Sequence, residues 1–321
     1  MKAIIFTEYG PPDVLQLKDV EKPTPKDNEV LIKIHAASAN AADWHTMRAE
    51  PFLARLANGL LKPKNPRLGA DLAGSVEAVG KNVTQFQAGD DVFGELPLDG
   101  LGSFAEYICS DEDALALKPV NMTFEQVAAV PLAAFTALQG LRDKGQIKSG
   151  QKVLINGASG GVGTFAVQIA KSFGTEVTGV CSTSKLDITR SIGADYVIDY
   201  TREDFTKNGK QYDLIFDAVG NRSINDYKRA LTPNGICVVA GFTSLTRLFQ
   251  YMLLGGKKVG LMETAHPDKK DLLFIKELLE SGKVVPVIDR VYPLMDVPEA
   301  IRYLEEGHAT GKVVITVEHK D

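Results

Sequence analysis

The sequence predicts an α/β protein that joins a β-rich, barrel-like or roll-like antiparallel domain to a doubly wound parallel sheet. Short β-branched runs bounded by Gly, Pro and Asp recur through residues 1–122. A glycine-rich loop at 157–163 connects an apolar strand to an amphipathic helix. From residue 151 strands alternate with helices, which favours a parallel sheet. We therefore expect a first domain at 1–122, a second at 123–267 and a tail at 268–321.

The first region contains short strands separated by turns. Residues 3–6, 30–34 and 74–79 are runs rich in Val, Ile and Ala, and Gly89–Gly94 is another expected strand, entered through a turn. This even spacing is typical of an antiparallel barrel or roll.

The sequence pattern changes after Asn121. Thr123 and Gln126 have capping-box spacing, so we expect a helical stretch from there to about residue 142. Beyond it strands and helices alternate. The expected strands are 152–156, 176–180, 196–199, 212–217, 235–240 and 259–262, and the expected helices include 164–173 and 185–192.

Composition excludes several classes of protein. At about 150 residues per domain, 321 residues suggest two domains. The 36 basic and 41 acidic residues are scattered, and the densest basic group, between Lys62 and Arg67, is too short to follow a phosphate backbone, so we expect no nucleic acid. No run approaches the ~20 apolar residues of a membrane span. The three cysteines form no CxxC pair, which favours a reducing, cytoplasmic location without disulfides.

The glycine loop Gly157–Gly163 carries the strongest signal. Its spacing is Ala158-x-Gly160-x-x-Gly163, with alanine in place of the first glycine of the strict pattern. Between a strand and a helix, such a loop lets backbone amides and the positive helix end approach a dinucleotide diphosphate. The alternative is a tight turn that binds nothing, and the strand–loop–helix context favours nucleotide binding.

The segment after the second strand predicts the cofactor. NAD-preferring proteins place an Asp or Glu about 20 residues beyond the loop, to bind the ribose 2′-hydroxyl. Here Cys181 stands 18 positions after Gly163 and is followed by Ser182, Thr183, Ser184 and Lys185. A carboxylate would repel a 2′-phosphate, whereas these hydroxyl groups and a cation would attract it. We expect NADPH; the alternative is an ordinary surface loop with a solvated lysine.

Several motifs in order resemble the medium-chain dehydrogenase/reductase superfamily, specifically its zinc-free quinone oxidoreductase (zeta-crystallin-like) branch, over almost the whole chain. The motifs are Gly69–Gly80, Gly89–Gly94, Gly102–Tyr107, Ala158–Gly163, Asp217–Gly220 and Gly311–Ile315. The resemblance implies a GroES-like catalytic domain, a Rossmann domain and a C-terminal return to the catalytic domain. It also implies a homodimer formed by edge-to-edge extension of the Rossmann sheet.

The resemblance also implies positions for the cofactor. Lys185 and Tyr200 would flank the 2′-phosphate, with Ser182 and Thr183 nearby. The diphosphate would meet Ser159, Gly160, Gly161 and Val162. The nicotinamide side would be lined by Thr136, Ala218, Val219, Gly220, Gly241, Phe242 and Val314.

Zinc-dependent members of this superfamily place a Cys near position 40 and a His at position 70. This chain has Asn40 and Ala70 there, and no cysteine-rich lobe. A catalytic zinc needs three protein ligands, so we expect no metal. Without a Lewis acid, alkoxide charge must be met by hydrogen bonds alone, which favours quinones and α,β-unsaturated carbonyls over simple ketones.

Two segments are candidates for the substrate pocket. Asn40 could donate to a carbonyl oxygen, and Asp43 could position a water or Asn40 itself; these are the candidate catalytic residues. The alternative is that Asp43 caps a helix and Trp44 packs in the core. Trp44, Phe52 and Phe242 are the candidate substrate contacts, with dimer or core packing as the alternative.

These observations predict an NADPH-dependent, zinc-free oxidoreductase that transfers a hydride to a quinone or another α,β-unsaturated carbonyl. No His, Tyr or Lys stands out as a general acid, so we expect solvent to supply the proton. The alternatives are an enoyl-thioester reductase, an alcohol/aldehyde dehydrogenase acting without metal, and a non-catalytic NADPH-binding scaffold, because fold alone does not establish function.

Overall fold

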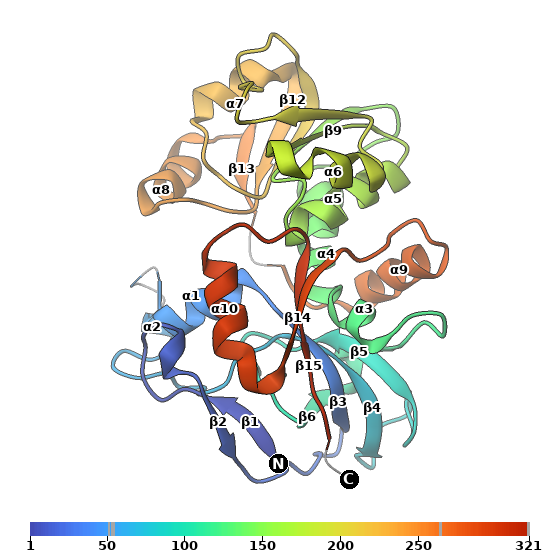
Figure 1. Ribbon diagram of the computed structural model, residues 1–321. Helices are drawn as coiled ribbons and strands as arrows, with labels where there is room; N and C mark the ends of the chain where they lie inside the picture. Colours follow the sequence, from blue (N-terminus) through green and yellow to red (C-terminus); the bar gives the residue numbers. More distant parts are fainter. Residues whose placement is uncertain (51, 53–54, 263–264, 320–321) are drawn as a thin grey trace. The chain divides into compact units, whose positions relative to one another are not determined.

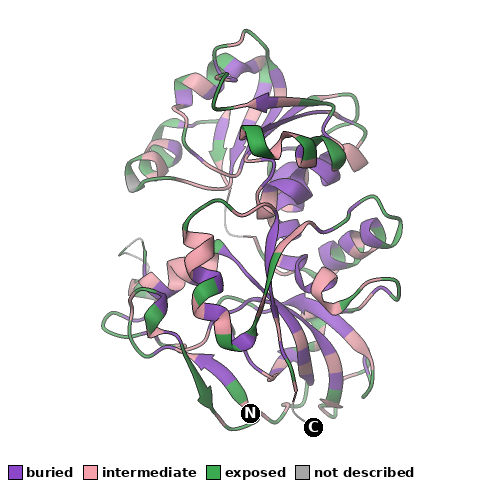
Figure 2. Ribbon diagram, in the orientation of Figure 1, coloured by how far each residue is buried: buried purple, intermediate pink, exposed green. Residues whose placement is uncertain are grey.

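The computed structural model describes residues 1–50, 52, 55–262 and 265–319, and the chain divides into two compact units (Figure 1). The first unit contains residues 1–132, 266–280 and 286–321, and the second contains residues 133–265 and 281–285. Each unit buries an apolar core of its own (Figure 2).

A mostly antiparallel sheet forms the first unit. Its strand order is β14-β15-β3-β4-β5-β7, with β6 also paired to β3, and only β14 and β15 run parallel. The strands are β3 (Glu29–Ala39), β4 (Asp71–Val79), β5 (Asp91–Glu95), β6 (Tyr107–Asp111), β7 (Leu115–Leu117), β14 (Ile288–Pro293) and β15 (Lys312–Thr316), beside the hairpin of β1 (Lys2–Ile5) and β2 (Gln16–Asp19). The helices are α1 (Ala41–Arg48), α2 (Arg55–Asn58), α3 (Phe124–Ala128), α9 (Lys269–Glu280) and α10 (Val297–Glu305).

The period-2 pattern of β3 explains why this sheet forms. Val30, Ile32 and Ile34 are fully buried and belong to the core, because alternate side chains of a strand face the same side. The C-terminal strand β15 pairs with β3, with Val314 opposite Ser38, so both ends of the chain build one sheet.

The second unit is a six-stranded parallel sheet with the order β10-β9-β8-β11-β12-β13. Counted from β8, this is the order 3-2-1-4-5-6 of a Rossmann fold. The strands are β8 (Lys152–Asn156), β9 (Glu176–Cys181), β10 (Tyr196–Asp199), β11 (Tyr212–Asp217), β12 (Leu231–Val239) and β13 (Val259–Leu261). The helices are α5 (Gly161–Ser172), α6 (Leu186–Ser191), α7 (Ile224–Ala230) and α8 (Leu245–Leu254), and α4 (Pro131–Gln139) continues into a π-helical turn at Gly140–Lys144.

The central strands of this sheet are apolar without alternation. Residues 153–155 of β8 and 214–216 of β11 are fully buried, as expected where both faces of a parallel sheet are covered. The predicted fold class, a β-rich domain with a doubly wound parallel sheet, is confirmed.

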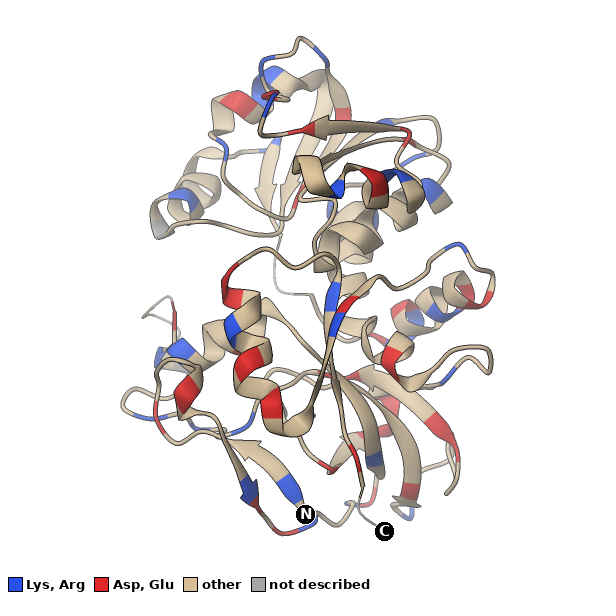
Figure 3. Cartoon of the chain, in the orientation of Figure 1, with Lys and Arg blue, Asp and Glu red and all other residues tan. Residues whose placement is uncertain are grey.

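Charged side chains of both signs are interspersed over both units (Figure 3). Within the described residues, no helix combines the length and the apolar character that crossing a membrane requires.

Candidate functional site

The glycine loop between β8 and α5 packs tightly against the helix at Gly163 but leaves space beside Gly160. A methyl group on Gly163 would lie 1.9 Å from the carbonyl oxygen of Gly157, whereas one on Gly160 would meet only that oxygen, at 3.5 Å. Gly157 itself has φ of 81°, in the left-handed region that favours glycine. The chain therefore turns at Gly157 and packs its carbonyl against Gly163 in the first turn of α5, while the backbone at Gly160 stays accessible.

The predicted diphosphate-binding residues form one continuous turn. Ser159 and Gly160 precede α5, and Gly161 and Val162 are its first two residues. The first amides of a helix lack intrahelical acceptors and lie at its positive end, so they suit an anion. With no side chain at Gly160 to block approach, this turn fits a dinucleotide diphosphate.

The residues predicted for the 2′-phosphate gather at the carboxyl ends of β9 and β10. Asp199 pairs with Cys181 in the parallel register, and Tyr200 donates its backbone N–H to the Cys181 carbonyl at 3.1 Å. Ser182, Thr183 and Lys185 follow Cys181 directly, in a short 3-10 turn that precedes α6. The structure thus brings all four predicted side chains to one edge of the sheet.

One carboxylate at this edge was missed by the sequence reasoning. Asp199 lies at the end of β10, where its oxygens accept hydrogen bonds from the Thr183 hydroxyl and from Thr201. Arg202 lies 3.5 Å from it. The Thr183 hydrogen bond lowers the pKa of Asp199, so this group is anionic but well matched by donors. It lies one strand beyond the position where the dinucleotide pattern places an acid.

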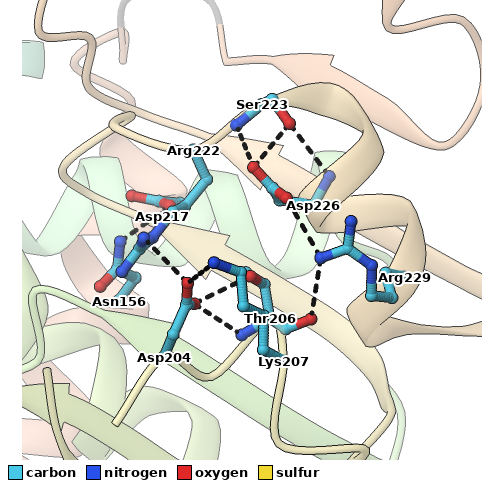
Figure 4. A network of polar contacts seen from close by, with 9 residues as sticks. All are labelled: Asn156, Asp204, Thr206, Lys207, Asp217, Arg222, Ser223, Asp226 and Arg229. Carbon is cyan, nitrogen blue, oxygen red and sulfur yellow. Dashed lines mark hydrogen bonds and ion pairs between the residues drawn. The ribbon is translucent and has the colours of Figure 1, made fainter. Parts of the chain in front are cut away.

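The ends of β11 and β12 form a second part of the candidate cofactor site. Asp217 is fully buried and accepts the backbone N–H groups of Val219 and Gly220, each at 2.7 Å. Its other oxygen accepts from Asn156 at 2.9 Å (Figure 4) and from Tyr227 at 2.6 Å. This carboxylate fixes the shape of the predicted Ala218–Gly220 segment.

Gly241 lies against the same segment. A methyl group on Gly220 would lie 2.0 Å from the Gly241 carbonyl oxygen, so the loops after β11 and β12 touch. Phe242 follows Gly241, and Thr136 lies on α4 in the second unit. Val314 belongs to β15 in the first unit, where it is buried.

A buried polar cluster lies at the end of β3 in the first unit; we call its members Ser38, Asn40, Asp71 and Lys312 the Asp71 cluster. Asp71 Oδ2 accepts from the Ser38 hydroxyl at 2.6 Å, from Asn40 Nδ2 at 2.9 Å and from Lys312 Nζ at 3.3 Å. Lys312 Nζ also donates to Asn40 Oδ1. Asp71 Oδ1 accepts the backbone N–H of Leu132 at 2.8 Å. A lysine buried this deeply is stable because it is paired and hydrogen-bonded.

The two candidate catalytic residues lie in and beside this cluster. The amide of Asn40 donates to Asp71 and, at a longer 3.2 Å, to the Ser38 carbonyl. Asp43 caps α1, because its oxygens accept the backbone N–H groups of Asn40 and Gly69, each at 2.8 Å. Burial raises the pKa of Asp43 to about 7, against the lowering effect of these two donors.

The predicted substrate contacts lie in both units. Trp44 packs against the core of the first unit and stacks on His45 with ring centroids 3.6 Å apart. Phe52 is 65% exposed, and its ring lies 5.0 Å from the guanidinium carbon of Arg55. Phe242 belongs to the second unit.

Comparison with known proteins identifies the family. The model of the alcohol dehydrogenase GroES-like domain matches residues 26–120, and the model described as zinc-binding dehydrogenase matches residues 192–315. The chain is 38% identical to a 2-methylene-furan-3-one reductase of Solanum lycopersicum, over 98% of this chain and 79% of that protein. The chain belongs to the medium-chain dehydrogenase/reductase superfamily.

Further relatives place it in the quinone oxidoreductase branch of that superfamily. An NADPH-dependent alkenal/one oxidoreductase, chloroplastic, of Arabidopsis thaliana is 36% identical over 98% of this chain and 79% of that protein. The solved structure of the quinone oxidoreductase from Coxiella burnetii superposes with a TM-score of 0.88 at 33% identity, covering 99% of each chain. This medium-chain dehydrogenase/reductase is therefore an oxidoreductase.

The residues of this medium-chain dehydrogenase/reductase do not fit a catalytic zinc at the expected position. Ala70 is buried and has no ligand atom, and Asn40 Oδ1 already accepts from the Lys312 ammonium. Among the described residues, no group of three His, Cys, Asp or Glu side chains is arranged to hold a metal ion.

Besides Asp199, the sequence reasoning gave no role to Asp71, to Lys312 or to Glu95, a buried acid whose backbone pairs with that of Asp71. Each lies in or directly beside a motif of the superfamily: Asp71 in Gly69–Gly80, Lys312 in Gly311–Ile315, and Glu95 immediately after Gly89–Gly94. That proximity was the available signal. The sequence alone could not show that these residues lie close together, because they are far apart along the chain.

Proposed function

We propose that this chain is an NADPH-dependent, zinc-free oxidoreductase that transfers a hydride to a quinone or another α,β-unsaturated carbonyl. The observation that carries the proposal is the buried Lys312 ammonium. It donates to Asn40 Oδ1 and pairs with the Asp71 carboxylate in the first unit, which contains the GroES-like domain. A cationic side chain can stabilise charge that is delocalised over an enolate or a hydroquinone anion. It is not a Lewis acid that could polarise an isolated carbonyl, which favours these conjugated acceptors over a simple ketone.

Binding of the cofactor rests on the second unit. The amides of Gly161 and Val162 bind the diphosphate at the start of α5, and Lys185 and Tyr200 flank the 2′-phosphate with Ser182 and Thr183. The charge of Asp199 opposes a 2′-phosphate less than a free carboxylate would, since Thr183, Thr201 and Arg202 already bind it. Reduced nicotinamide supplies the hydride when NADPH is bound.

Binding of the acceptor rests on Asn40. Its amide donates one N–H to Asp71 and the other, at a longer 3.2 Å, to the Ser38 carbonyl, and a carbonyl oxygen of the substrate would compete with Ser38 for this second N–H. Its bonds with Asp71 and Lys312 hold the rest of the amide in place, while Asp43 fixes the helix that begins beside it. Trp44, Phe52 and Phe242 are the proposed apolar contacts of the acceptor.

The test is the decay of nicotinamide absorbance with purified protein, a 1,4-quinone or an enone, NADPH or NADH, and a chelator. The proposal expects acceptor-dependent oxidation that is faster with NADPH and unchanged by the chelator. NADPH binding without turnover of either acceptor would refute it and would direct attention to enoyl thioesters. Loss of activity with the chelator would refute the zinc-free part alone.

We also propose that the chain forms a homodimer through the edge of the second unit's sheet. β13 is an edge strand, and α8, which contacts it, exposes Phe249, Met252 and Leu253. Pairing with a second copy would extend the sheet and cover these side chains. Light scattering should give twice the chain mass, and Leu253→Glu should give the monomer. A monomeric wild type would refute the proposal.

A reducing compartment such as the cytoplasm is the proposed location. All three cysteines are free thiols, and Cys181 and Cys237 are buried. Buried thiols of this kind persist where disulfides are not favoured. Cell fractionation of the source organism tests this location.

A further inference from the structure

Glu95 is a buried acid that the proposed function does not use. It is the last residue of β5, and its backbone pairs with that of Asp71 across the sheet. Its side chain is only 3% exposed, and among the described residues no hydrogen-bonding group contacts its buried Oε2 atom. Buried polar atoms are almost always partnered, so this carboxyl group calls for an explanation.

The neighbouring donors are already committed to Asp71. The Ser38 hydroxyl, the Asn40 amide, the Lys312 ammonium and the Leu132 N–H all bind its carboxylate. The Asp71 carboxylate is therefore surrounded by donors, whereas Oε2 of Glu95 has no hydrogen-bonding partner among the described residues. An ionised Glu95 would be a second buried anion, which is costly without a partner.

The charged groups around Glu95 therefore favour its neutral form. Burial and the Asp71 charge on β4 raise the pKa of Glu95 to about 9, and Lys312 on β15 only partly offsets them. Asp43 on α1 is a further titratable group beside the Asp71 cluster, and the charges of Asp71 and Lys312 act on it as well. A neutral carboxyl group carries a proton on an oxygen, and the proposed acceptor is a molecule whose oxygen or α-carbon must gain one.

We propose that Glu95 is the proton donor of the reaction. The inference rests on the proposed function. Hydride addition at the β-carbon shifts the C=C electron pair into an enolate, which leaves a negative charge shared by the α-carbon and the oxygen. The O–H bond of Glu95 breaks as its proton moves to the enolate, and the Glu95 carboxylate then takes a proton from solvent. The sum is enone, NADPH and H⁺ giving saturated ketone and NADP⁺.

This role separates two kinds of acceptor. An enolate must be protonated before the product leaves, so its formation depends on an acid in the site. The hydroquinone anion formed from an electron-poor quinone can leave unprotonated and gain its proton in solution. Removing the Glu95 proton should therefore slow reduction of an enone and spare reduction of such a quinone.

The experiment compares wild type with Glu95→Gln, an isosteric change that keeps the side chain neutral but gives it no acidic proton. For an α,β-unsaturated ketone, we expect kcat to fall by roughly 100-fold or more, the usual range for loss of a general acid. For the quinone, and for NADPH affinity measured by fluorescence titration, we expect changes below threefold. Wild-type kcat with the enone should also fall as pH rises above about 9, and this limb should be missing in Glu95→Gln.

A conservative variant and a matched control define the result. Glu95→Asp should recover part of the enone activity together with a high-pH limb. The control is Glu77→Gln. Glu77 is exposed near the end of β4 that lies away from Asp71, so this variant should behave like wild type. The infrared difference spectrum, wild type minus Glu95→Gln, gives a readout independent of turnover, because the contribution of Asp43, with a pKa of about 7, is common to both proteins and cancels. We expect a protonated-carboxyl C=O band in this difference at pH 7 that fades above about pH 9.

The inference and the proposed function fail in different ways. If wild type reduces the enone and Glu95→Gln matches it with the same pH profile, Glu95 is not the donor. Equal loss of activity on both acceptors, or absence of the infrared band, also overturns its role. If wild type reduces neither acceptor, the proposed function itself is wrong.

Discussion

Gly160 and Gly163, which lie before and within the first turn of α5, should respond differently in stability to the same substitution, a change to alanine. At Gly163 the new Cβ would lie 1.9 Å from the Gly157 oxygen, 2.7 Å from the Gly157 carbonyl carbon and 2.9 Å from the carbonyl carbon of Ala158. These are backbone atoms, so no side-chain rotation can relieve the clash. At Gly160 the nearest atom is 3.5 Å away, an ordinary contact distance.

The magnitudes follow from these distances. Gly163→Ala must move the first turn of α5 away from the loop by about 1 Å, and overpacking of this kind costs about 1–3 kcal/mol or more of the free energy of unfolding. At about 2–4 °C per kcal/mol we expect the Tm to fall by roughly 5–10 °C. Gly160 has φ of −85° and ψ of 178°, which any residue adopts. Gly160→Ala should therefore lower the free energy of unfolding by only about 0.5 kcal/mol.

Thermal unfolding and NADPH titration together test this pair. Gly163→Ala should lose both stability and affinity. Gly160→Ala should melt like wild type yet bind NADPH about tenfold or more weakly, because its methyl group projects where the diphosphate approaches the amides of α5. A Gly163→Ala protein that melts within a degree of wild type would refute the close packing of loop and helix. Unchanged NADPH affinity in Gly160→Ala would refute the diphosphate site.

Three further outcomes are expected. Lys312→Met should lower the free energy of unfolding by about 3–5 kcal/mol because it leaves the buried Asp71 carboxylate without its cation. Adding Asp71→Asn should recover part of this loss in urea unfolding. Additive effects of the two substitutions would contradict the pairing. Because the folded-state pKa of Glu95 is raised from 4.5 to about 9, the folded protein binds more protons over that range and loses stability as pH rises through it. The Tm advantage of Glu95→Gln over wild type should therefore grow between pH 5 and about pH 9, and a pH-independent difference would count against a buried, protonated Glu95. Lys185→Ala should reduce the preference for NADPH over NADH by about tenfold, as one lost charge-assisted contact implies; equal loss with both cofactors would show that Lys185 does not read the 2′-phosphate.

Local patterns were enough to predict the second unit closely. The expected strands at 152–156, 196–199 and 212–217 match β8, β10 and β11 residue for residue. Parallel strands buried on both faces are continuous apolar runs with sharp polar boundaries, so their limits can be read from neighbouring residues. The glycine loop was equally local, and its role as a cofactor site remains a proposal.

The buried cluster of the first unit could not be predicted in this way. Asn40 was identified as a candidate catalytic residue, but its partners Asp71 and Lys312 lie 31 and 272 positions from it along the chain. Only the pairing of β3 with β4 and β15 brings them together. Glu95 was missed for the same reason: a glutamate after a strand is usually solvated, and its burial depends on the whole sheet.

The position of β15 affects the order in which this protein can assemble during synthesis. β3 emerges from the ribosome early, yet its partner β15 is made later, 274 positions beyond Ala39 at the pair Val313–Ala39, after the whole second unit has been translated. The second unit, residues 133–265 and 281–285, can fold while β3 of the first unit still lacks its neighbour β15. Lys312 arrives with that strand, so Asp71 gains its cation only when the chain closes on itself. A product truncated before residue 312 would leave β3 with an open edge, which favours aggregation, and Asp71 without its buried cation, which lowers stability and increases the unfolded fraction exposed to proteases.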